Sequence, residues 1–386
     1  MARVVIIAGE TSGDRLGASL IRAAREISPD TRFEGVTGPL MREAGCETWF
    51  DHQELAVMGF FEVVNHLPRL LSRKREVERR LLADPPDVLV GVDSPDFNLR
   101  IERVAKKNGI PTVHYVCPTV WAWRPGRVHG LDASADHVLC VFPFEAKFLA
   151  EHGVPATFVG HPLADEIAEP EEPMRCRSKL GLTAETVVAL LPGSRKSEVT
   201  RNGPAFAKTA AWLARRIDGI KFVAPMATPA LSELFSRQLR KHARDVDVRL
   251  LQGDSQSAIV ASDAVIVASG TATLETMLLR RPMVVACKLG PITYLVARQL
   301  IKAEYIGMPN LMAGRPIVTE LIQSDANAEA LGTEVIDLLE SSDRRNELAE
   351  AFAEQHCRLR LGAGKIAAEV VLGMAGLLDK DAERAD

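Results

Sequence analysis

Residues 187–195 read Val-Val-Ala-Leu-Leu-Pro-Gly-Ser-Arg, an apolar strand that runs into a glycine turn and a fixed positive charge. Residues 264–275 read Ala-Val-Ile-Val-Ala-Ser-Gly-Thr-Ala-Thr-Leu-Glu and repeat this arrangement. The residues after each turn suit the first turn of a helix, so both stretches predict a strand–turn–helix unit. A helix N-terminus offers free backbone N–H groups that suit phosphate oxygens. Together the two turns predict a clamp for a nucleotide diphosphate.

The polar groups of the two turns suit different parts of a nucleotide. Backbone N–H groups and a guanidinium suit the phosphates, hydroxyls add further donors, and a carboxylate one helical turn later suits the ribose. The alternative for residues 193–195 is an ordinary tight turn with a surface arginine. The alternative for residues 269–275 is a helix cap followed by an acid in the first turn. Because both turns fall in one domain, nucleotide binding is the prediction. The candidate residues are Gly193, Ser194, Arg195, Ser269, Gly270, Thr271 and Glu275.

Length and composition indicate a two-domain globular protein. At 386 residues the chain is too long for one ordinary core, and two domains of roughly 150 to 200 residues are expected. The apolar fraction of 47% is ordinary, and a net charge of −4 gives no overall attraction for nucleic acid. The six cysteines lack the spacing of a zinc site. We expect a reducing, cytoplasmic setting, with no metal and no cofactor.

No signal peptide is recognisable at the start of the sequence, and no apolar run reaches the length of about 18 residues that a spanning helix needs. We therefore expect neither export nor a membrane-spanning segment.

Strand signals alternate with helical patterns along the chain. They lie at residues 3–8, 87–92, 112–116 and 137–141, and again at 187–191, 221–224, 248–251, 264–268 and 283–286. This alternation predicts an α/β protein with two Rossmann-like parallel sheets. Ligands of such sheets bind beyond the carboxyl ends of the strands, so we expect the two domains to face each other across a cleft. The predicted domains are residues 1–168 and 169–345, joined through the Glu-Pro-rich stretch 165–175 and followed by a helical segment, 346–386.

Two acids in the first domain are candidate general bases. Asp93 ends the buried strand 87–92, and a carboxylate at that position indicates chemical use. Glu10 lies in the turn 9–14, whose acids would repel a pyrophosphate but suit sugar hydroxyls. For Asp14 in the same turn, sugar binding and helix capping are both open. Asp93 is the predicted base, and Glu10 is the alternative.

Other residues have a structural and a functional interpretation. Asn310 is a candidate for orienting a sugar or a diphosphate. Trp121 and Trp123 are expected either to pack in the core or to line an acceptor cleft. His114 and His161 have no metal partners in the sequence, so we predict structural hydrogen bonding for both.

An apolar stretch followed by a basic helix predicts a membrane-facing surface. Residues 57–64 are unusually apolar, and the helix after them is basic on one face and leucine-rich on another. The alternative is a core face with a solvated basic face opposite. The candidate membrane and acceptor residues are Val57, Met58, Phe60, Phe61, Arg69, Arg73, Lys74 and Arg75.

These motifs, in this order, resemble those of the lipid-A-disaccharide synthases. The resemblance runs through nearly the whole chain and includes the stretches 54–59 and 120–124. It is carried most clearly by Ala8-Gly9-Glu10-Thr11-Ser12-Gly13-Asp14, Gly91-Val92-Asp93-Ser94-Pro95-Asp96-Phe97-Asn98, Leu191-Pro192-Gly193-Ser194-Arg195, Ala268-Ser269-Gly270-Thr271-Ala272 and Pro309-Asn310-Leu311. The resemblance implies a GT-B glycosyltransferase of lipid A and lipopolysaccharide biosynthesis, peripherally bound to the cytoplasmic face of a Gram-negative inner membrane.

The resemblance also implies a reaction and its partners. The family transfers an acylated glucosamine from UDP-2,3-diacylglucosamine to 2,3-diacylglucosamine 1-phosphate, which inverts the anomeric carbon, forms a β-1,6 bond and releases UDP. On this sequence Asp93 or Glu10 would serve as the base, and Arg195 would meet the charge of the leaving diphosphate. Asn310 would join the two glycine turns in the UDP-sugar site. The expected partners are the two lipid substrates and an anionic membrane surface, without nucleic acid.

Two other functions remain open from the sequence. A UDP-sugar epimerase of the same architecture would keep the nucleotide clamp without an acylated acceptor, and a non-catalytic UDP-sugar-binding regulator would keep it without a base. For the C-terminal segment the alternatives are a return to the first domain and an exchange between the subunits of a homodimer.

Overall fold

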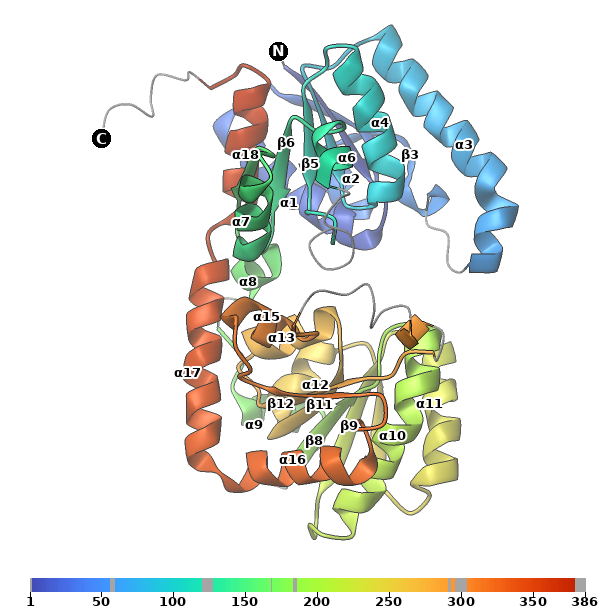
Figure 1. Cartoon of the computed structure of the whole chain (residues 1–386), viewed down its shortest axis with the longest axis vertical. Helices are drawn as coiled ribbons and strands as arrows, with labels where there is room; N and C mark the ends of the chain where they lie inside the picture. Colours follow the sequence, from blue (N-terminus) through green and yellow to red (C-terminus); the bar gives the residue numbers. More distant parts are fainter. Residues whose placement is uncertain are drawn as a thin grey trace. The chain divides into compact units, whose positions relative to one another are not determined.

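The chain folds into two compact units, shown by a computed structural model in Figure 1. The structure describes residues 2–55, 60–119, 128–167, 169–182, 186–290, 293–295 and 304–378, with the backbone alone for residues 60–67. Unit 1 comprises residues 1–165 and 359–386, and unit 2 comprises residues 166–358. The chain therefore leaves unit 1 once and returns to it near its end.

Unit 1 is built on a parallel seven-stranded sheet of order β3-β2-β1-β4-β5-β6-β7. The strands are β1 (Arg3–Ala8), β2 (Arg32–Thr37), β3 (Glu47–Asp51), β4 (Val88–Val92), β5 (Thr112–Tyr115), β6 (His137–Cys140) and β7 (Ala156–Phe158). The helices are α1 (Thr11–Ile27), α2 (Pro39–Glu43), α3 (Phe60–Ala83), α4 (Pro95–Lys107), α6 (Val128–Asp132), α7 (Pro143–Glu151), α8 (Pro162–Glu166) and, from the chain end, α18 (Ala363–Met374), with a short 3-10 helix at His52–Glu54.

Unit 2 is built on a parallel six-stranded sheet of order β10-β9-β8-β11-β12-β13. The strands are β8 (Val187–Leu191), β9 (Lys221–Met226), β10 (Val248–Gln252), β11 (Ala264–Ala268), β12 (Met283–Cys287) and β13 (Thr319–Ile322). The helices are α9 (Pro173–Lys179), α10 (Lys196–Ala214), α11 (Pro229–His242), α12 (Ser255–Ala261), α13 (Thr271–Leu278), α15 (Met308–Ala313), α16 (Ala328–Glu340) and α17 (Ser342–Leu359).

The central strands are buried along their whole length. Every residue of β4, β8 and β11 is buried, and these strands consist almost entirely of valine, leucine, isoleucine and alanine. Such continuous apolar runs are expected where helices cover both faces of a parallel sheet. The predicted α/β class with two Rossmann-like parallel sheets is confirmed.

Both sheets reverse their strand order at one point. In unit 1 the chain moves outward from β1 to β2 and β3 and then begins again at β4, on the other side of β1. In unit 2 the same reversal lies between β8 and β11. Connections on the two sides of a reversal cover opposite faces of the sheet, which leaves the strand ends between them open. The loops after β1, β4, β8 and β11 therefore begin at positions suited to ligands.

Helix α18 completes the core of unit 1 (Figure 1). Its buried residues Ala367, Ala368 and Val371 belong to the same apolar cluster as Leu20 and Ile21 of α1. The two helices approach closely at Gly364, where a Cβ atom would lie 2.4 Å from the Ser19 hydroxyl oxygen and 3.0 Å from the Ser19 carbonyl oxygen. The predicted C-terminal segment 346–386 is thus divided: residues 346–358 belong to unit 2, and the chain from residue 359 belongs to the N-terminal unit.

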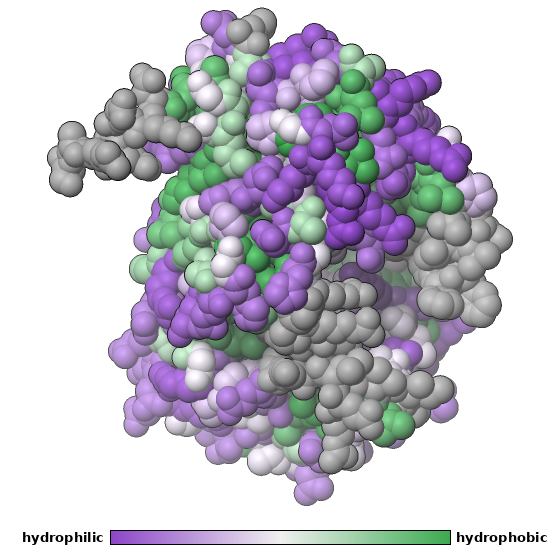
Figure 2. All heavy atoms as spheres, turned by 45° about the horizontal axis from the view of Figure 1, so that its top comes forward, coloured by the Kyte–Doolittle hydropathy of each residue, from purple (hydrophilic) through white to green (hydrophobic). Residues whose placement is uncertain are grey.

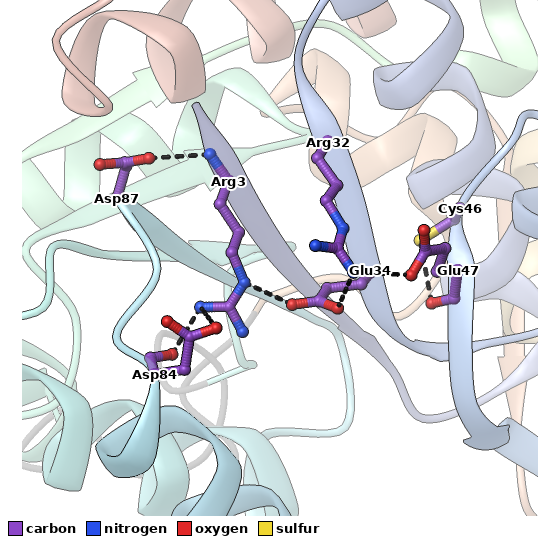
Figure 3. A network of polar contacts seen from close by, with 7 residues as sticks. All are labelled: Arg3, Arg32, Glu34, Cys46, Glu47, Asp84 and Asp87. Atoms are coloured by element: carbon purple, nitrogen blue, oxygen red, sulfur yellow. Dashed lines mark hydrogen bonds and ion pairs between the residues drawn. The ribbon is translucent and has the colours of Figure 1, made fainter. Parts of the chain in front are cut away.

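A polar network joins the opposite, amino-terminal ends of four strands in unit 1, β1 to β4 (Figure 3). The Arg3 guanidinium pairs with the buried Glu34 carboxylate, and the Arg3 backbone N–H donates to Asp87 over 2.7 Å. Arg32 pairs with Glu47 over 2.9 Å. Because each partner lies at or near the start of a strand, the network holds together the ends of the strands opposite the loops that follow β1 and β4.

The structure differs from the sequence-based expectation in a few elements. Strands β2, β3, β7 and β13 were not among the predicted strands. Helix α1 begins at Thr11, so four of the six residues of the predicted turn 9–14 are already helical. Within the described residues no helix is long and apolar enough to cross a membrane.

We expect Gly364→Ala to lower the stability of unit 1 by about 1–3 kcal/mol, since the added methyl group would push α18 away from Ser19 of α1. Gly373→Ala is the matched control. Gly373 lies in the same helix, and no atom of the described residues would lie within 4 Å of a Cβ atom there. The control should gain about 0.5–1 kcal/mol from the better helix former. Chemical denaturation followed by circular dichroism measures both, and equal effects at the two positions would contradict the described packing of α18.

Candidate active site

Asp93 and Ser94 lie at the end of β4 in an uncommon backbone conformation. Their φ angles are +53° and +45°, so two consecutive non-glycine residues occupy the left-handed region. This conformation costs about 1–2 kcal/mol per residue and is concentrated at functional sites. Asp93 is half-buried, and its backbone N–H donates to the Tyr115 carbonyl of the neighbouring strand over 2.8 Å. The strand end thus restrains the backbone of Asp93 at the reversal of the sheet.

The loop that carries Glu10 touches the loop that carries Asp93. A Cβ atom at Gly9 would lie 2.0 Å from the Ser94 hydroxyl oxygen, so glycine is required for this approach. Glu10 is exposed and precedes α1, and its side chain makes no capping hydrogen bond there. The structure therefore places the loops of both candidate bases in contact, one after β1 and the other after the neighbouring strand β4.

Asp14 has a structural role that the sequence left open. Its buried carboxylate accepts hydrogen bonds from the backbone N–H groups of Gly38, Leu40 and Met41, at 2.9, 2.9 and 3.0 Å. These N–H groups belong to the first turn of α2 and the residue before it. Asp14 therefore caps α2, a helix other than its own, and its oxygens are occupied within the protein.

Both histidines singled out in the sequence are held by local hydrogen bonds. His114 Nδ1 lies 2.8 Å from Glu102 Oε1, and the pair is almost completely buried beneath β4. Burial raises the pKa of the Glu102 carboxyl group. His161 Nδ1 accepts from the Leu163 backbone N–H, and burial lowers the pKa of His161 to about 4. In the described part of the chain, no three acidic, histidine or cysteine side chains are grouped as metal ligands.

The two glycine turns of unit 2 meet at one edge of the sheet. Strands β8 and β11 are parallel neighbours, so the turns that follow them lie beside each other. Gly193 and Gly270 have φ angles of +129° and +142°, which only glycine adopts readily. No atom of the described residues would lie within 4 Å of a Cβ atom at Gly270, so this part of the chain leaves the space next to the turn open. Thr271 begins α13 immediately after it.

Glu198 occupies the backbone donors of the first turn. Its carboxylate accepts from the N–H groups of Ser194 and Arg195 at 2.9 and 3.2 Å. The Arg195 side chain is 77% exposed, and its nearest ion-pair contact, to the same carboxylate, is 3.7 Å. The guanidinium thus remains accessible, whereas the two N–H groups expected for phosphate are already hydrogen-bonded. Glu198 is not among the residues predicted for the site, although a glutamate three residues after a helix N-cap indicates such a bond.

Glu275 is held by Ser255, a residue outside the predicted site. The Ser255 hydroxyl group lies 3.1 Å from each of the two Glu275 carboxylate oxygens. Ser255 is the first residue of α12, which follows β10. A hydroxyl group that lies against both oxygens orients the carboxylate.

Asn310 and Ser269 tie the loop before β13 to the second glycine turn. The Asn310 amide is buried; it donates to the Val318 carbonyl and the Glu320 carboxylate and accepts from the backbone N–H groups of Ile317 and Val318. The Ser269 hydroxyl donates to the Ile306 carbonyl over 2.7 Å. All four hydrogen-bonding positions of the Asn310 amide are therefore used inside unit 2.

The basic residues of α3 divide into two groups. Arg69 and Arg73 pair with Glu54, at 3.0 and 2.6 Å, and Lys74 pairs with Glu78 at 2.7 Å. Arg73 also lies over the Phe50 ring. Arg75 and Arg79 are exposed, and the described residues provide no ion pair for either. Three of the four predicted basic membrane residues are thus paired within unit 1.

Apolar side chains accompany the exposed arginines. Leu71 and Leu82 are 41% and 46% exposed, and helical spacing places both on the face that carries Arg75 and Arg79. Figure 2 shows that the described part of one face of the molecule is mostly hydrophilic, with smaller hydrophobic areas between. The predicted residues Val57 and Met58, and also Trp121 and Trp123, lie outside the described residues, and Phe60 and Phe61 are described only as backbone of α3.

Two Rossmann-like units in one chain are the architecture of the GT-B fold, and solved structures share this fold. The UDP-GlcNAc 2-epimerase of Neisseria meningitidis, bound to UDP-GlcNAc, aligns with 96% of this chain and 100% of its own at a TM-score of 0.63 and 12% identity. A glycotransferase of kitacinnamycin aligns with 97% of this chain and 99% of its own at a TM-score of 0.65 and 15% identity. At these identities the likeness shows the fold alone.

Sequence comparison identifies the family within this fold. A family model described as lipid-A-disaccharide synthetase matches residues 4–370. A lipid-A-disaccharide synthase of Azotobacter vinelandii is 48% identical over 375 residues, which are 97% of this chain and 98% of the relative. The chain belongs to the lipid-A-disaccharide synthase family and is a glycosyltransferase of lipid A biosynthesis. This membership favours the synthase over the epimerase and the regulator that the sequence motifs had left open.

We expect Asp14→Ala to destabilise unit 1 by about 3 kcal/mol, because it leaves the Gly38, Leu40 and Met41 N–H groups without their acceptor. Glu10→Ala, in the same turn but exposed, should change stability by less than about 0.5 kcal/mol. Thermal unfolding of the two variants measures the difference. An Asp14→Ala protein of unchanged stability would return Asp14 to the list of substrate-binding candidates.

Proposed function

We propose that this chain condenses UDP-2,3-diacylglucosamine with 2,3-diacylglucosamine 1-phosphate to give the β-1,6-linked disaccharide 1-phosphate and UDP. One observation supports this reaction beyond family membership. In each unit, the residues suited to the chemistry lie in the two loops at the reversal of strand order: Glu10 and Asp93 in unit 1, and Arg195 and Ser269 in unit 2. Unit 1 would supply the base, and unit 2 would bind the leaving nucleotide.

In this proposal the Asp93 carboxylate accepts the proton of the acceptor hydroxyl group. The hydroxyl oxygen then forms a bond to the anomeric carbon of the donor while the bond from that carbon to the UDP oxygen breaks, and its electron pair stays with UDP. A single displacement of this kind inverts the anomeric carbon. The half-buried, fixed position of Asp93 favours it over the exposed Glu10 as the base.

Unit 2 would bind UDP through fixed donors. The exposed Arg195 guanidinium suits the developing charge on the diphosphate, and Thr271 and the Gly270 turn present further N–H and hydroxyl groups. Glu275, oriented by Ser255, would accept from the ribose hydroxyls. Because its amide is fully engaged, Asn310 would hold the loop 306–320 against this site without touching the nucleotide. Gly193, Ser194 and Ser269 would shape the two turns.

For the membrane we propose a narrower surface than the sequence predicted. The outward face of α3, with Leu71, Arg75, Arg79 and Leu82, combines exposed apolar and unpaired basic side chains. Such a face suits peripheral binding to an anionic leaflet, where acylated substrates reside. Arg69 and Arg73 would instead hold α3 against Glu54 of the 3-10 helix. Lys74 would pair with Glu78 within α3 itself.

Release of UDP from UDP-2,3-diacylglucosamine, with and without 2,3-diacylglucosamine 1-phosphate in detergent micelles, tests the reaction. We expect release only when the acceptor is present, with a disaccharide product identified by mass. In Asp93→Asn, turnover should fall by about 10² to 10⁴-fold, the usual contribution of a general base. UDP affinity should stay unchanged, because the proposed nucleotide site lies in unit 2.

The controls separate the parts of the proposal. An active wild-type enzyme with an active Asp93→Asn variant would move the base to another residue, and Glu10→Gln would be the next variant. A wild-type protein that binds UDP but releases none from either lipid would contradict the reaction itself. A single converted sugar in place of a disaccharide would point to an epimerase.

The membrane surface is tested with the double variant Arg75→Glu/Arg79→Glu. We expect weaker sedimentation with vesicles that contain phosphatidylglycerol, and a loss of wild-type binding with increasing salt. Arg215→Glu/Arg244→Glu is the matched control, since both arginines are exposed on unit 2 and the change in net charge is the same. Equal loss of binding in both double variants would assign the effect to net charge and not to α3.

A further inference from the structure

The buried side chain of Asn98 lies directly beneath the candidate base. Asn98 is on the first turns of α4 and is completely inaccessible to solvent. Its Nδ2 group lies within hydrogen-bonding distance of three backbone carbonyls, those of Ile7, Val92 and Asp93, at 3.2, 3.2 and 2.8 Å, so one of its two N–H groups is shared between two acceptors. One amide therefore joins the carboxyl ends of β1 and β4 and the backbone of Asp93 itself.

The geometry of these bonds fixes which way the amide points. Three carbonyl oxygens surround one end of the side chain, so that end must be the NH2 group. The Asn98 Oδ1 atom then faces the other way, and no group among the described residues donates to it. A buried acceptor without a donor is unfavourable and needs a compensating reason. The hydrogen bond from the NH2 group to the Asp93 carbonyl is such a reason.

The bond to Asp93 acts on a strained stretch of backbone. Asp93 and Ser94 both have left-handed φ angles, and neither is a glycine. Without an external restraint, such residues relax toward ordinary conformations. That relaxation would turn the Asp93 carboxylate away from its present direction, because the side chain follows the backbone angles of its own residue.

We propose that Asn98 is the positioning residue of the base: its amide holds the left-handed Asp93 backbone between β1 and β4 and thereby aims the carboxylate at the acceptor hydroxyl group. This inference rests on the proposed role of Asp93. Asn98 does not touch the substrates and does not transfer a proton. Its contribution appears in the chemical step, since a small misplacement of a reacting group reduces turnover strongly while binding elsewhere is kept.

Asn98→Asp tests the proposal with almost no change in shape. The introduced carboxyl group can donate one hydrogen bond when protonated, whereas its ionised form repels the three carbonyl oxygens. Ionisable groups near Asn98 include Asp93, and Glu102 of α4 with its partner His114 of β5. We expect kcat to fall about 10- to 100-fold with little change in KM, and to fall further as the pH rises relative to wild type.

Two further variants keep the test independent of folding. Asn98→Ser removes the reach of the amide without adding a charge, and should lower kcat to a similar extent at all pH values. Ile101→Ala is the matched control, because Ile101 is equally buried in α4 but belongs to the apolar core. It should lower the melting temperature at least as much as the Asn98 variants while kcat stays near wild type.

The outcomes are distinct. Wild-type kcat in Asn98→Ser, or an equal loss of kcat in Ile101→Ala at the same melting temperature, would overturn the positioning role. If Asp93→Asn is inactive and Asn98→Ser is active, the positioning inference alone fails. If Asp93→Asn itself retains turnover, the assignment of the base fails, and the positioning role fails with it.

Discussion

The handedness of the connections between parallel strands is the constraint on which this structure depends. A right-handed crossover places its helix on one face when the chain moves outward in one direction, and on the other face when the direction is reversed. Each sheet of this chain reverses once, between β1 and β4 and between β8 and β11. At these two positions no crossover helix can cover the strand ends. The open positions exist for reasons of backbone geometry, before any side chain is specified.

Within that constraint, the two units use their open positions differently. Unit 1 presents carboxylates and supports them from below with buried polar side chains: Asn98 under Asp93, and the Glu102–His114 pair further along α4. Unit 2 presents a cation, hydroxyls and glycine turns, and two of its acids are hydrogen-bonded within the unit: Glu198 to the first turn and Glu320 to Asn310. An acceptor that must lose a proton and a donor that must release an anion require opposite electrostatic settings.

The sequence alone was sufficient where local pattern and burial agree. Strands such as β8 and β11 are buried on both faces, so their unbroken apolar runs identify them, and the α/β class follows. Strand β2 was not predicted because Arg32, Glu34 and Gly35 interrupt its apolar pattern. In the fold, Glu34 pairs with Arg3 of β1 and Arg32 pairs with Glu47 of β3. The hydrogen bonds that support the candidate site could not be predicted from the sequence either. Asp14 caps a helix more than twenty residues away, and Ser255 meets Glu275 from another connection. Such contacts depend on tertiary distance, which spacing along the chain does not encode.

The return of α18 to unit 1 has a consequence for the order in which the protein is made. A ribosome completes residues 1–165 long before residues 363–374, with all of unit 2 synthesised in between. Until then the face of α1 with Leu20 and Ile21 lacks the helix that covers it. Unit 2, in contrast, is one continuous stretch of chain and has all of its strands once β13 emerges. The second unit is therefore the first that can finish folding, and the nascent first unit carries an uncovered apolar face of the kind that chaperones bind.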